Sequence, residues 1–155
     1  MTVNLKEKPF YLEQEGINWV HDTIEKMSLA EKYHIGGARY TETDAEKIFR
    51  QNQYYQKYSK IPMFIAVNGE TGGNGICSGG TFVATEAECE AAGDTGAAYG
   101  MGLVAGREAH ALGCNWNFAP MADMVFNWRN TIVNTRSFGT DPDIVTEMCR
   151  AYLKG

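Results

Sequence analysis

The sequence predicts an α/β domain with a parallel sheet, on the basis of three observations. Segments with strand character alternate along the chain with segments of helical periodicity. The central strand, Ile61–Val67, is continuously apolar after Pro62, as expected for a strand covered by helices on both faces. Polar and glycine-rich segments follow the strands, at the carboxyl ends where functional sites of parallel sheets lie. We therefore expect parallel strands joined by right-handed helical crossovers.

Five helices are predicted from apolar spacing and from residues that begin or end helices. They are Leu12–Met27, a short helix from Ser28, Thr43 to about Tyr58, about Asp94 to Leu112, and a last helix from Asp141. Ser28 and Thr43 each begin a capping box. Gly113 suits the position after the fourth helix, and Pro142 suits the first position of the last. The expected inward residues are Ile17, Val20, Ile24 and Met27, then Ala45, Ile48, Phe49 and Tyr55, and finally Ile144, Val145, Met148 and Tyr152.

The other two strands are expected near residues 34–38 and over Cys114–Phe118. A glycine-dense loop, Asn68–Thr81, follows the central strand, and a long loop, Ala119–Thr140, follows the last one. The fourth helix carries Gly96, Gly100, Gly102 and Gly106. Glycine inside a helix costs up to about 1 kcal/mol relative to alanine. We expect these glycines to allow close packing of the helix against the sheet.

Composition excludes several functional classes. Hydrophobic residues make up 44% and charged residues 21% of 155 residues, which is typical of a globular domain. The formal net charge of −5, without a Lys/Arg run, gives no footprint for nucleic acid or an anionic membrane. The N-terminus has no apolar signal-peptide region, so we expect a cytoplasmic protein. Four scattered cysteines and three scattered histidines predict neither a metal site nor a disulfide scaffold, and no cofactor is indicated.

Polar residues after the strands are the site candidates. Asn68 and Glu70 belong either to a substrate loop or to a flexible connector, and no nucleotide-binding motif is present there. Asp123 either binds substrate or, as we favour, hydrogen-bonds loop backbone. Arg136 either donates to a sugar or carboxylate or braces its own loop. Three glutamates at positions 86, 88 and 90 are expected to form a solvated helix end.

Several segments, taken in order, resemble the N-terminal domain of glycoside hydrolase family 3. They are Met27–Lys32, Ile61–Ala66, Glu70–Gly73, Gly102–Glu108, Asn117–Pro120 and Asn134–Pro142. The Thr-Arg-Ser-Phe-Gly stretch from Thr135 is more similar to the β-N-acetylglucosaminidase branch than to the β-glucosidase branch. The resemblance implies a partial (β/α)₈ TIM barrel, with roughly the first three strands and their helices, in a longer parent protein. An incomplete barrel would expose sheet edges, so we also expect self-association.

The resemblance also implies a retaining exo-β-glycosidase that hydrolyses O-glycosyl bonds, with a carbohydrate as its partner. The family's nucleophilic Asp, its acid/base group and its Lys-His pair would follow Gly155, so we expect no catalytic residue in this chain and no activity from the chain alone. Arg136 matches the family's sugar-contacting arginine. Asn68 stands where the family usually has Asp, which keeps an acceptor oxygen but removes the charge. Glu70 and Asp123 complete the expected substrate-binding set and do not match the nucleophile.

Two alternatives stay open. Within the family, the activity could be that of a β-glucosidase or β-xylosidase. In a different class, the chain could be a non-catalytic sugar-binding or interaction module, which Asn68 in place of Asp favours.

Overall fold

The computed structural model describes residues 4, 6–7, 11–27, 37–39 and 43–155. The chain divides into two compact units, residues 1–35 and 36–155. In the first unit, helix α1 spans Gln14–Lys26, which confirms the first predicted helix, although none of its residues is buried. The predicted helix from Ser28 lies outside the described residues, as do residues 34–36 of the first predicted strand.

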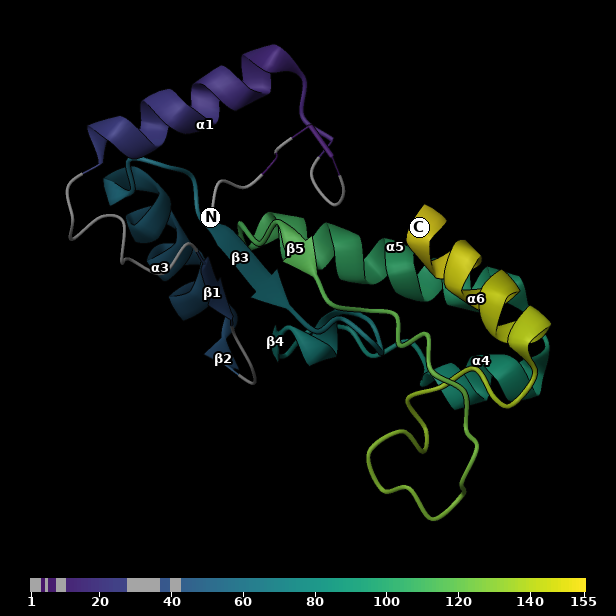
Figure 1. Cartoon of the computed structure of the whole chain (residues 1–155). Coiled ribbons are helices and arrows are strands. Elements are labelled where there is room, and N and C mark those ends of the chain that lie inside the picture. Colours follow the sequence, from purple (N-terminus) through teal and green to yellow (C-terminus); the bar gives the residue numbers. More distant parts are fainter. Residues whose placement is uncertain (1–3, 5, 8–10, 28–36, 40–42) are drawn as a thin grey trace. The chain divides into compact units, whose positions relative to one another are not determined.

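The second unit contains a three-stranded parallel sheet in the order β1-β3-β5 (Figure 1). The strands are β1, Gly37–Arg39; β3, Phe64–Val67; and β5, Trp116–Asn117. A second, two-stranded parallel sheet pairs β2, Thr43–Asp44, with β4, Cys77–Ser78. The predicted α/β class with parallel strands is therefore confirmed. The glycine-dense loop is more structured than predicted, because it contains β4 and the 3-10 turn η1, Gly73–Gly75.

Four α-helices of the second unit are described: α3, Ala45–Tyr58; α4, Glu86–Ala92; α5, Thr95–Ala111; and α6, Pro142–Lys154. Their ends follow local capping chemistry. Asp141 accepts hydrogen bonds from the first backbone N–H groups of α6, with Pro142 at the first helical position as predicted. Gly113 adopts a left-handed conformation (φ 78°) directly after Leu112, the C-cap residue of α5. The cap of α3 is Asp44, one residue later than predicted, and its carboxylate accepts from the Lys47 N–H at 3.1 Å.

Two hydrophobic clusters hold this unit together. The first packs α4, α5 and α6 around Phe138, and its other members are Cys89, Ala98, Met101, Ala105, Ala119, Val145, Met148 and Tyr152. The second lies between α3 and the sheet and consists of Ile48, Ile65, Val67, Ile76, Cys77, Ala109 and Cys114. Four positions predicted to be buried are exposed instead: Ile24 in α1 is 49% exposed, and Phe49, Ile144 and Phe64 are 41%, 39% and 59% exposed.

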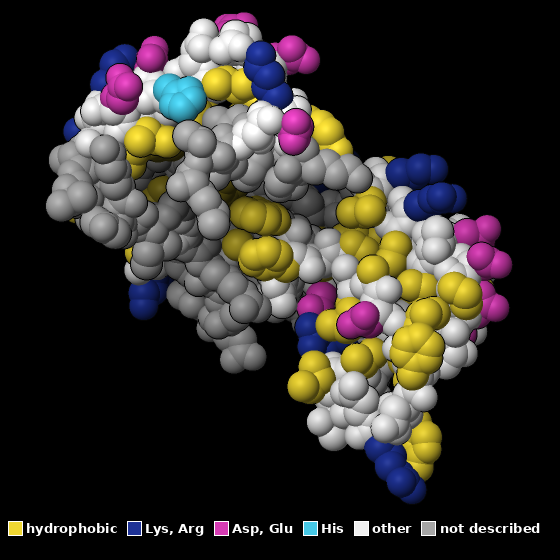
Figure 2. Space-filling view, viewed as in Figure 1, with side chains coloured by type: hydrophobic (Ala, Val, Ile, Leu, Met, Phe, Trp, Pro, Cys, Tyr) yellow, Lys and Arg dark blue, Asp and Glu magenta, His cyan; other side chains and the backbone are white. Residues whose placement is uncertain are grey.

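One side of the sheet carries exposed aromatic side chains. Trp116 contacts Phe64 and Phe118 with ring centroids 5.0 and 5.2 Å apart, and all three rings are largely exposed. In the space-filling view, hydrophobic side chains reach the surface over the sheet (Figure 2). The face of β3 that carries Phe64 is therefore only partly covered, because Phe64 is exposed whereas Ala66 on the same face is buried; the sequence predicted full burial of both faces. In the part of the chain that the structure describes, no helix is long and apolar enough to cross a membrane.

One glycine of α5, Gly102, packs against α6 rather than against the sheet. The two helices lie side by side (Figure 1), and Gly102 is the point of closest approach. A Cβ atom added at Gly102 would run into the backbone carbonyl of Tyr152 on α6. Gly106, one turn further along α5, has open space around the position of a Cβ atom. The predicted packing role thus holds for Gly102, with a different partner, and does not hold for Gly106.

We therefore expect a glycine-to-alanine substitution to have opposite effects on stability at two positions of α5. Gly102→Ala should lower the free energy of unfolding by about 1–3 kcal/mol, because overpacking against Tyr152 forces α5 and α6 apart. Gly106→Ala should raise it by about 0.5–1 kcal/mol, because alanine favours the helix and meets no neighbour. Urea unfolding followed by circular dichroism measures both values. Equal effects of the two substitutions would contradict the close α5–α6 contact.

Candidate functional site

The ends of β3 and β5 lie side by side, and the loops that follow them are cross-linked. Val67 and Asn117 are paired in register. The Asn117 side-chain oxygen accepts hydrogen bonds from the backbone N–H of Gly69 (2.9 Å) and of Ala119 (3.2 Å). Its amide group donates to the Tyr152 hydroxyl (2.8 Å), which donates in turn to the Gly69 carbonyl (2.7 Å). One asparagine thus ties together both loops and helix α6.

Burial determines the protonation state of the Tyr152 hydroxyl in this hydrogen-bond chain. Tyr152 is 4% exposed, and desolvation is the main reason why its pKa is raised to about 12. Its hydroxyl therefore stays protonated at neutral pH and keeps its donor role. The sequence identified Tyr152 only as an apolar position of α6, and Asn117 only as part of a strand. Nothing local in the sequence marked either side chain as a loop anchor.

The glycine-dense loop folds back tightly on itself and on α5. Gly72 has a φ of 105°, a left-handed conformation that favours glycine. The Glu108 carboxylate on α5 accepts from the Thr81 N–H at 3.0 Å, and a Cβ atom added at Gly73 would collide with that carboxylate. The loop is therefore a packed element that presents Asn68 and Glu70, rather than a flexible connector.

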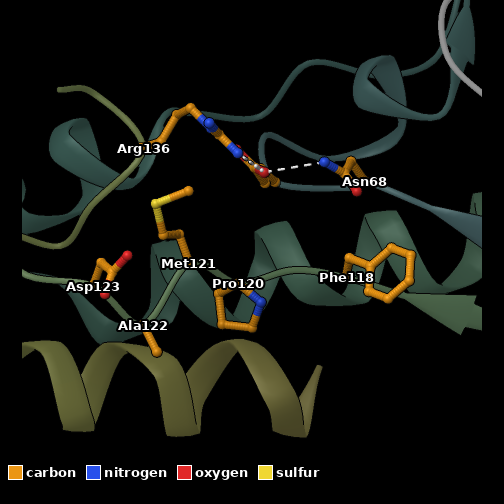
Figure 3. Close-up of a pocket in the computed structure, with 8 residues that line it drawn as sticks. Asn68, Phe118, Pro120, Met121, Ala122, Asp123 and Arg136 are labelled. Carbon is orange, nitrogen blue, oxygen red and sulfur yellow. Dashed lines mark hydrogen bonds and ion pairs between the residues drawn. The ribbon is translucent and has the colours of Figure 1, made fainter. Parts of the chain in front are cut away.

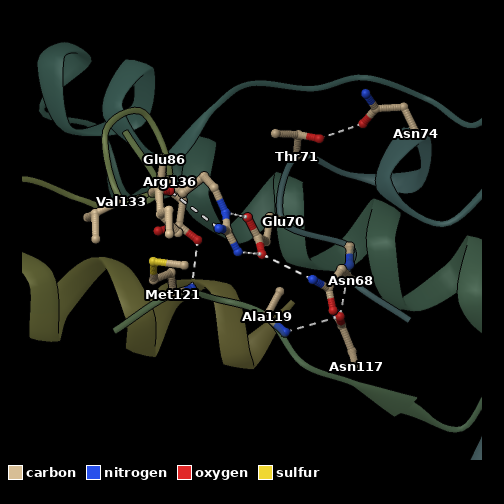
Figure 4. Close-up of polar contacts among 12 residues, drawn as sticks. Asn68, Glu70, Thr71, Asn74, Glu86, Asn117, Ala119, Met121, Val133 and Arg136 are labelled. Carbon is tan, nitrogen blue, oxygen red and sulfur yellow. Dashed lines mark hydrogen bonds and ion pairs between the residues drawn. The ribbon is translucent and has the colours of Figure 1, made fainter. Parts of the chain in front are cut away.

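A bidentate ion pair joins this loop to the long loop after β5. Arg136 donates from Nε to one Glu70 oxygen at 2.6 Å and from Nη2 to the other at 2.7 Å (Figure 4). Asn68 donates to the same Glu70 carboxylate at 3.4 Å. Arg136 also donates from Nη1 to the Ile132 carbonyl at 3.3 Å. The Glu70 carboxylate therefore binds the side chains of both Arg136 and Asn68.

The ion pair favours the protonated form of Arg136. Arg136 has a raised pKa, chiefly because its guanidinium donates to Glu70. The Glu70 side chain is 13% exposed and the Arg136 side chain 38% exposed. Two charge-assisted hydrogen bonds in parallel fix the orientation of the guanidinium plane. The pair thus sets the position of Arg136, and the loop after β3 determines where that pair lies.

The four predicted substrate-binding residues line one open cavity of about 500 Å³ (Figure 3). Its lining consists of Asn68, Glu70, Phe118, Pro120, Met121, Ala122, Asp123 and Arg136. The volume lies in the range of small-molecule sites. Asn68 and Arg136 therefore share a pocket at the carboxyl ends of the strands, the region in which the sequence placed the site candidates. Their role in binding a sugar stays a prediction.

Pro120, Met121, Ala122 and Asp123 form one side of this cavity, which we call the 120–123 wall. Its middle is held by Glu86, which accepts from the Met121 N–H at 2.8 Å. Its far end is held by Ser137, whose hydroxyl donates to the Asp123 carbonyl at 2.5 Å. The expected hydrogen bond between the Asp123 side chain and loop backbone is not found among the described residues: Asp123 is held through its backbone carbonyl, and its side chain is exposed at the cavity.

The exposure of Glu86 differs most from the sequence prediction. It was expected on a solvated helix end, but it is 1% exposed, whereas Glu88 in the same helix is exposed and caps it through Thr85. Desolvation raises the pKa of Glu86 to about 8, and the nearby Glu70 carboxylate adds to the rise. The Met121 hydrogen bond and the Arg136 charge act in the opposite direction. Glu86 is therefore mostly a neutral carboxylic acid at pH 7.

Known proteins similar to this chain are glycosidases and related enzymes. It is 30% identical over 175 residues to a beta-N-acetylglucosaminidase/beta-glucosidase of Cellulomonas fimi, covering 98% of this chain and 31% of that protein. It is 29% identical to beta-hexosaminidase A of Pseudoalteromonas piscicida, covering 84% of this chain and 24% of that protein. The chain thus spans less than a third of the length of these relatives.

Solved structures similar to this chain are likewise glycosidases and related enzymes. A beta-glucoside phosphorylase, BglX, superposes with a TM-score of 0.85 at 34% identity, over 97% of this chain and 31% of that one. A glycoside hydrolase family 3 beta-N-acetylglucosaminidase from Paenibacillus sp. str. FPU-7 superposes with a TM-score of 0.72 at 27% identity, over 78% of this chain and 24% of that one. The model of the glycosyl hydrolase family 3 N terminal domain matches residues 5–155. This chain therefore belongs to glycoside hydrolase family 3, within its N-terminal domain.

Proposed function

We propose that this chain is the first part of a (β/α)₈ barrel, with roughly its first three strands, in a retaining exo-β-glycosidase acting on β-N-acetylglucosaminides. The parallel order β1-β3-β5, with helices between the strands, supports the barrel. The names of the Cellulomonas, Pseudoalteromonas and Paenibacillus relatives support the substrate. The Cellulomonas relative's name also includes beta-glucosidase, so β-glucosides are the alternative substrate.

The observation that carries this proposal is the cavity between Asn68 and Arg136. The buried Asn68 side-chain oxygen has no hydrogen-bond partner among the described residues. Buried polar atoms are normally hydrogen-bonded, so this oxygen suits a hydroxyl group that donates to it. Arg136 has five N–H groups, of which three are used by Glu70 and Ile132, leaving two for a ligand. An acceptor and a fixed donor across one cavity match the alternating hydroxyl groups of a sugar.

The carboxylates at this cavity are poor choices for the chemical step. Glu70 is held by Arg136 through both oxygens, which lowers its availability as a nucleophile. Asp123 is exposed at the outer end of the 120–123 wall. A retaining mechanism needs two catalytic groups at one anomeric carbon. We propose that these groups come from other parts of a longer protein and that this chain contributes the sugar-binding wall.

A second candidate is phosphorolysis at the same site. The structural match to a beta-glucoside phosphorylase, with a TM-score of 0.85, is the observation that favours it. In this reaction the glycosyl group passes to inorganic phosphate instead of water, so the product is a sugar 1-phosphate. The sugar would bind the same residues in both reactions, and only the acceptor would differ.

The exposed face of the sheet supports a proposal about assembly. The contiguous rings of Phe64, Trp116 and Phe118 form an apolar strip that is costly to leave in water. We propose that further strands of the barrel cover this strip in the complete protein, and that the chain alone self-associates. We also propose a cytoplasmic location, on the composition of residues 1–11.

The complete protein that carries this chain should release nitrophenol faster from a nitrophenyl β-N-acetylglucosaminide than from the matching β-glucoside. Arg136→Ala should raise KM by about tenfold or more, because a charge-assisted donor to the sugar is lost. Assays with and without inorganic phosphate, with product identified by NMR, separate the two acceptors: free sugar supports hydrolysis and sugar 1-phosphate supports phosphorolysis. Faster turnover of the β-glucoside would reverse the preferred substrate, and no turnover of either glycoside would contradict the proposed activity.

The 155-residue chain alone should hydrolyse neither glycoside and should still bind N-acetylglucosamine weakly. Titration followed by ¹⁵N NMR should shift the amide signals of Asn68, Met121 and Arg136. Arg136→Ala should lower the affinity by about tenfold, whereas Arg107→Ala, at an exposed position of α5, should leave it unchanged. Hydrolysis by the chain alone would show that it contains its own catalytic groups. Binding by the chain, together with an inactive complete protein, would favour a non-catalytic sugar-binding module.

A further inference from the structure

Glu86 occupies a position that the sugar-binding proposal leaves unexplained. It is the first residue of α4, and its carboxyl group lies between the Glu70–Arg136 pair and the 120–123 wall (Figure 4). One oxygen accepts from the Met121 N–H at 2.8 Å. The other is buried without a hydrogen-bond partner in the described part of the chain. Burying a carboxyl group to 1% exposure costs folding free energy. This cost is explained if the hydrogen bond that Glu86 accepts from the Met121 N–H serves the site.

We propose that Glu86 is a positioning residue of the cavity, which holds the Met121 backbone and thereby fixes the 120–123 wall opposite Asn68 and Arg136. The inference rests on the proposed sugar site and adds a residue that does not itself line the cavity. Asn117 holds the chain just before the wall through the Ala119 N–H, and Ser137 holds the end of the wall through the Asp123 carbonyl. Glu86 supplies the anchor between them, so its loss frees the middle of the wall.

The protonation state of Glu86 makes this anchor sensitive to pH. Its pKa of about 8 means that the neutral acid, which dominates at pH 7, gives way to the carboxylate above pH 8. The carboxylate would be buried beside the Glu70 carboxylate, with Arg136 already engaged by Glu70. Burying an unpaired charge is unfavourable, so the wall should open to admit water. The intact wall therefore persists below pH 8 and is lost as the pH rises through about 8.

The thiol and phenol groups near Glu86 titrate at higher pH, because burial raises their pKa values. On α6, the Cys149 thiol and the Tyr152 hydroxyl have raised pKa values, and the Tyr152 value is about 12. On α4, burial raises the pKa of the Cys89 thiol. The charged groups on the two loops are Glu70 and Arg136, which form an ion pair. A transition near pH 8 that disappears in Glu86→Gln thus reports on Glu86 itself.

The test compares Glu86→Gln, Glu86→Met and the wild-type chain by ¹⁵N NMR between pH 6.5 and 9.5, with and without N-acetylglucosamine. Glutamine keeps an oxygen that accepts from Met121 and cannot ionise, whereas methionine removes the anchor. In the wild type, the Met121 amide signal should titrate with a midpoint near 8, and sugar affinity should fall about tenfold from pH 6.5 to 9.5. Glu86→Gln should show neither change. Glu86→Met should bind the sugar about tenfold more weakly at both pH values.

Glu88→Gln is the matched control, because it removes a carboxylate from the same helix at an exposed position. It should behave as the wild type in both measurements. A Met121 signal that does not titrate near pH 8, or a Glu86→Gln chain whose affinity falls like that of the wild type, would overturn the positioning role. No sugar binding at any pH, with the Met121 titration present in the wild type and absent in Glu86→Gln, would contradict the sugar site while supporting the Glu86–Met121 contact.

Discussion

The bidentate pair between Glu70 and Arg136 is the interaction on which the cavity depends. It joins the loop after β3 to the loop after β5 through hydrogen bonds of 2.6 and 2.7 Å. The two residues are 66 positions apart in sequence, and parallel strand pairing brings their loops to the same edge of the sheet. Asn68 donates to the same carboxylate, so its free side-chain oxygen is oriented by the pair as well. One glutamate, Glu70, therefore positions both residues that we propose to bind the sugar, Asn68 and Arg136.

The helices supply the remaining constraints on the loops. Tyr152 on α6 and Asn117 at the end of β5 fix the first residues of both loops. Close contact between α5 and α6 at Gly102 lets Tyr152 reach that position, because a larger residue there would displace the α6 backbone. Helix α4 adds Glu86 behind the 120–123 wall. Polar loops over an open cavity thus hold their shape through buried hydrogen bonds that originate in packed helices.

The sequence predicted elements whose determinants are local. The Asp141–Pro142 start of α6 and the Gly113 end of α5 depend on neighbouring residues alone, so they were predicted correctly. The predicted residues Asn68, Glu70, Asp123 and Arg136 line one cavity because residues that follow parallel strands lie at one edge of the sheet. The exposure of Phe64 was not predicted, because a run of apolar residues does not reveal which of them stays uncovered.

Long-range contacts account for the remaining differences between the sequence predictions and the structure. Glu86 precedes its partner Met121 by 35 positions, and a glutamate at a helix start is usually solvated, so local sequence predicted exposure. The partner of Gly102 is 50 positions away on α6, which no periodicity in α5 identifies. Tyr152 fits the apolar face of its helix, so its hydroxyl contacts had no sequence signal. A buried carboxyl between two loops is recognisable only when both loops are in place.

A double-mutant cycle on Glu70 and Arg136 tests most directly whether this pair builds the cavity. The free energies of unfolding of the wild type, Glu70→Gln, Arg136→Met and the double variant are measured by urea denaturation. We predict a coupling energy of about 1–2 kcal/mol, a value reduced from that of a fully buried pair because Arg136 is partly exposed. Single substitutions whose effects add to within about 0.5 kcal/mol would contradict a pair that holds the two loops together.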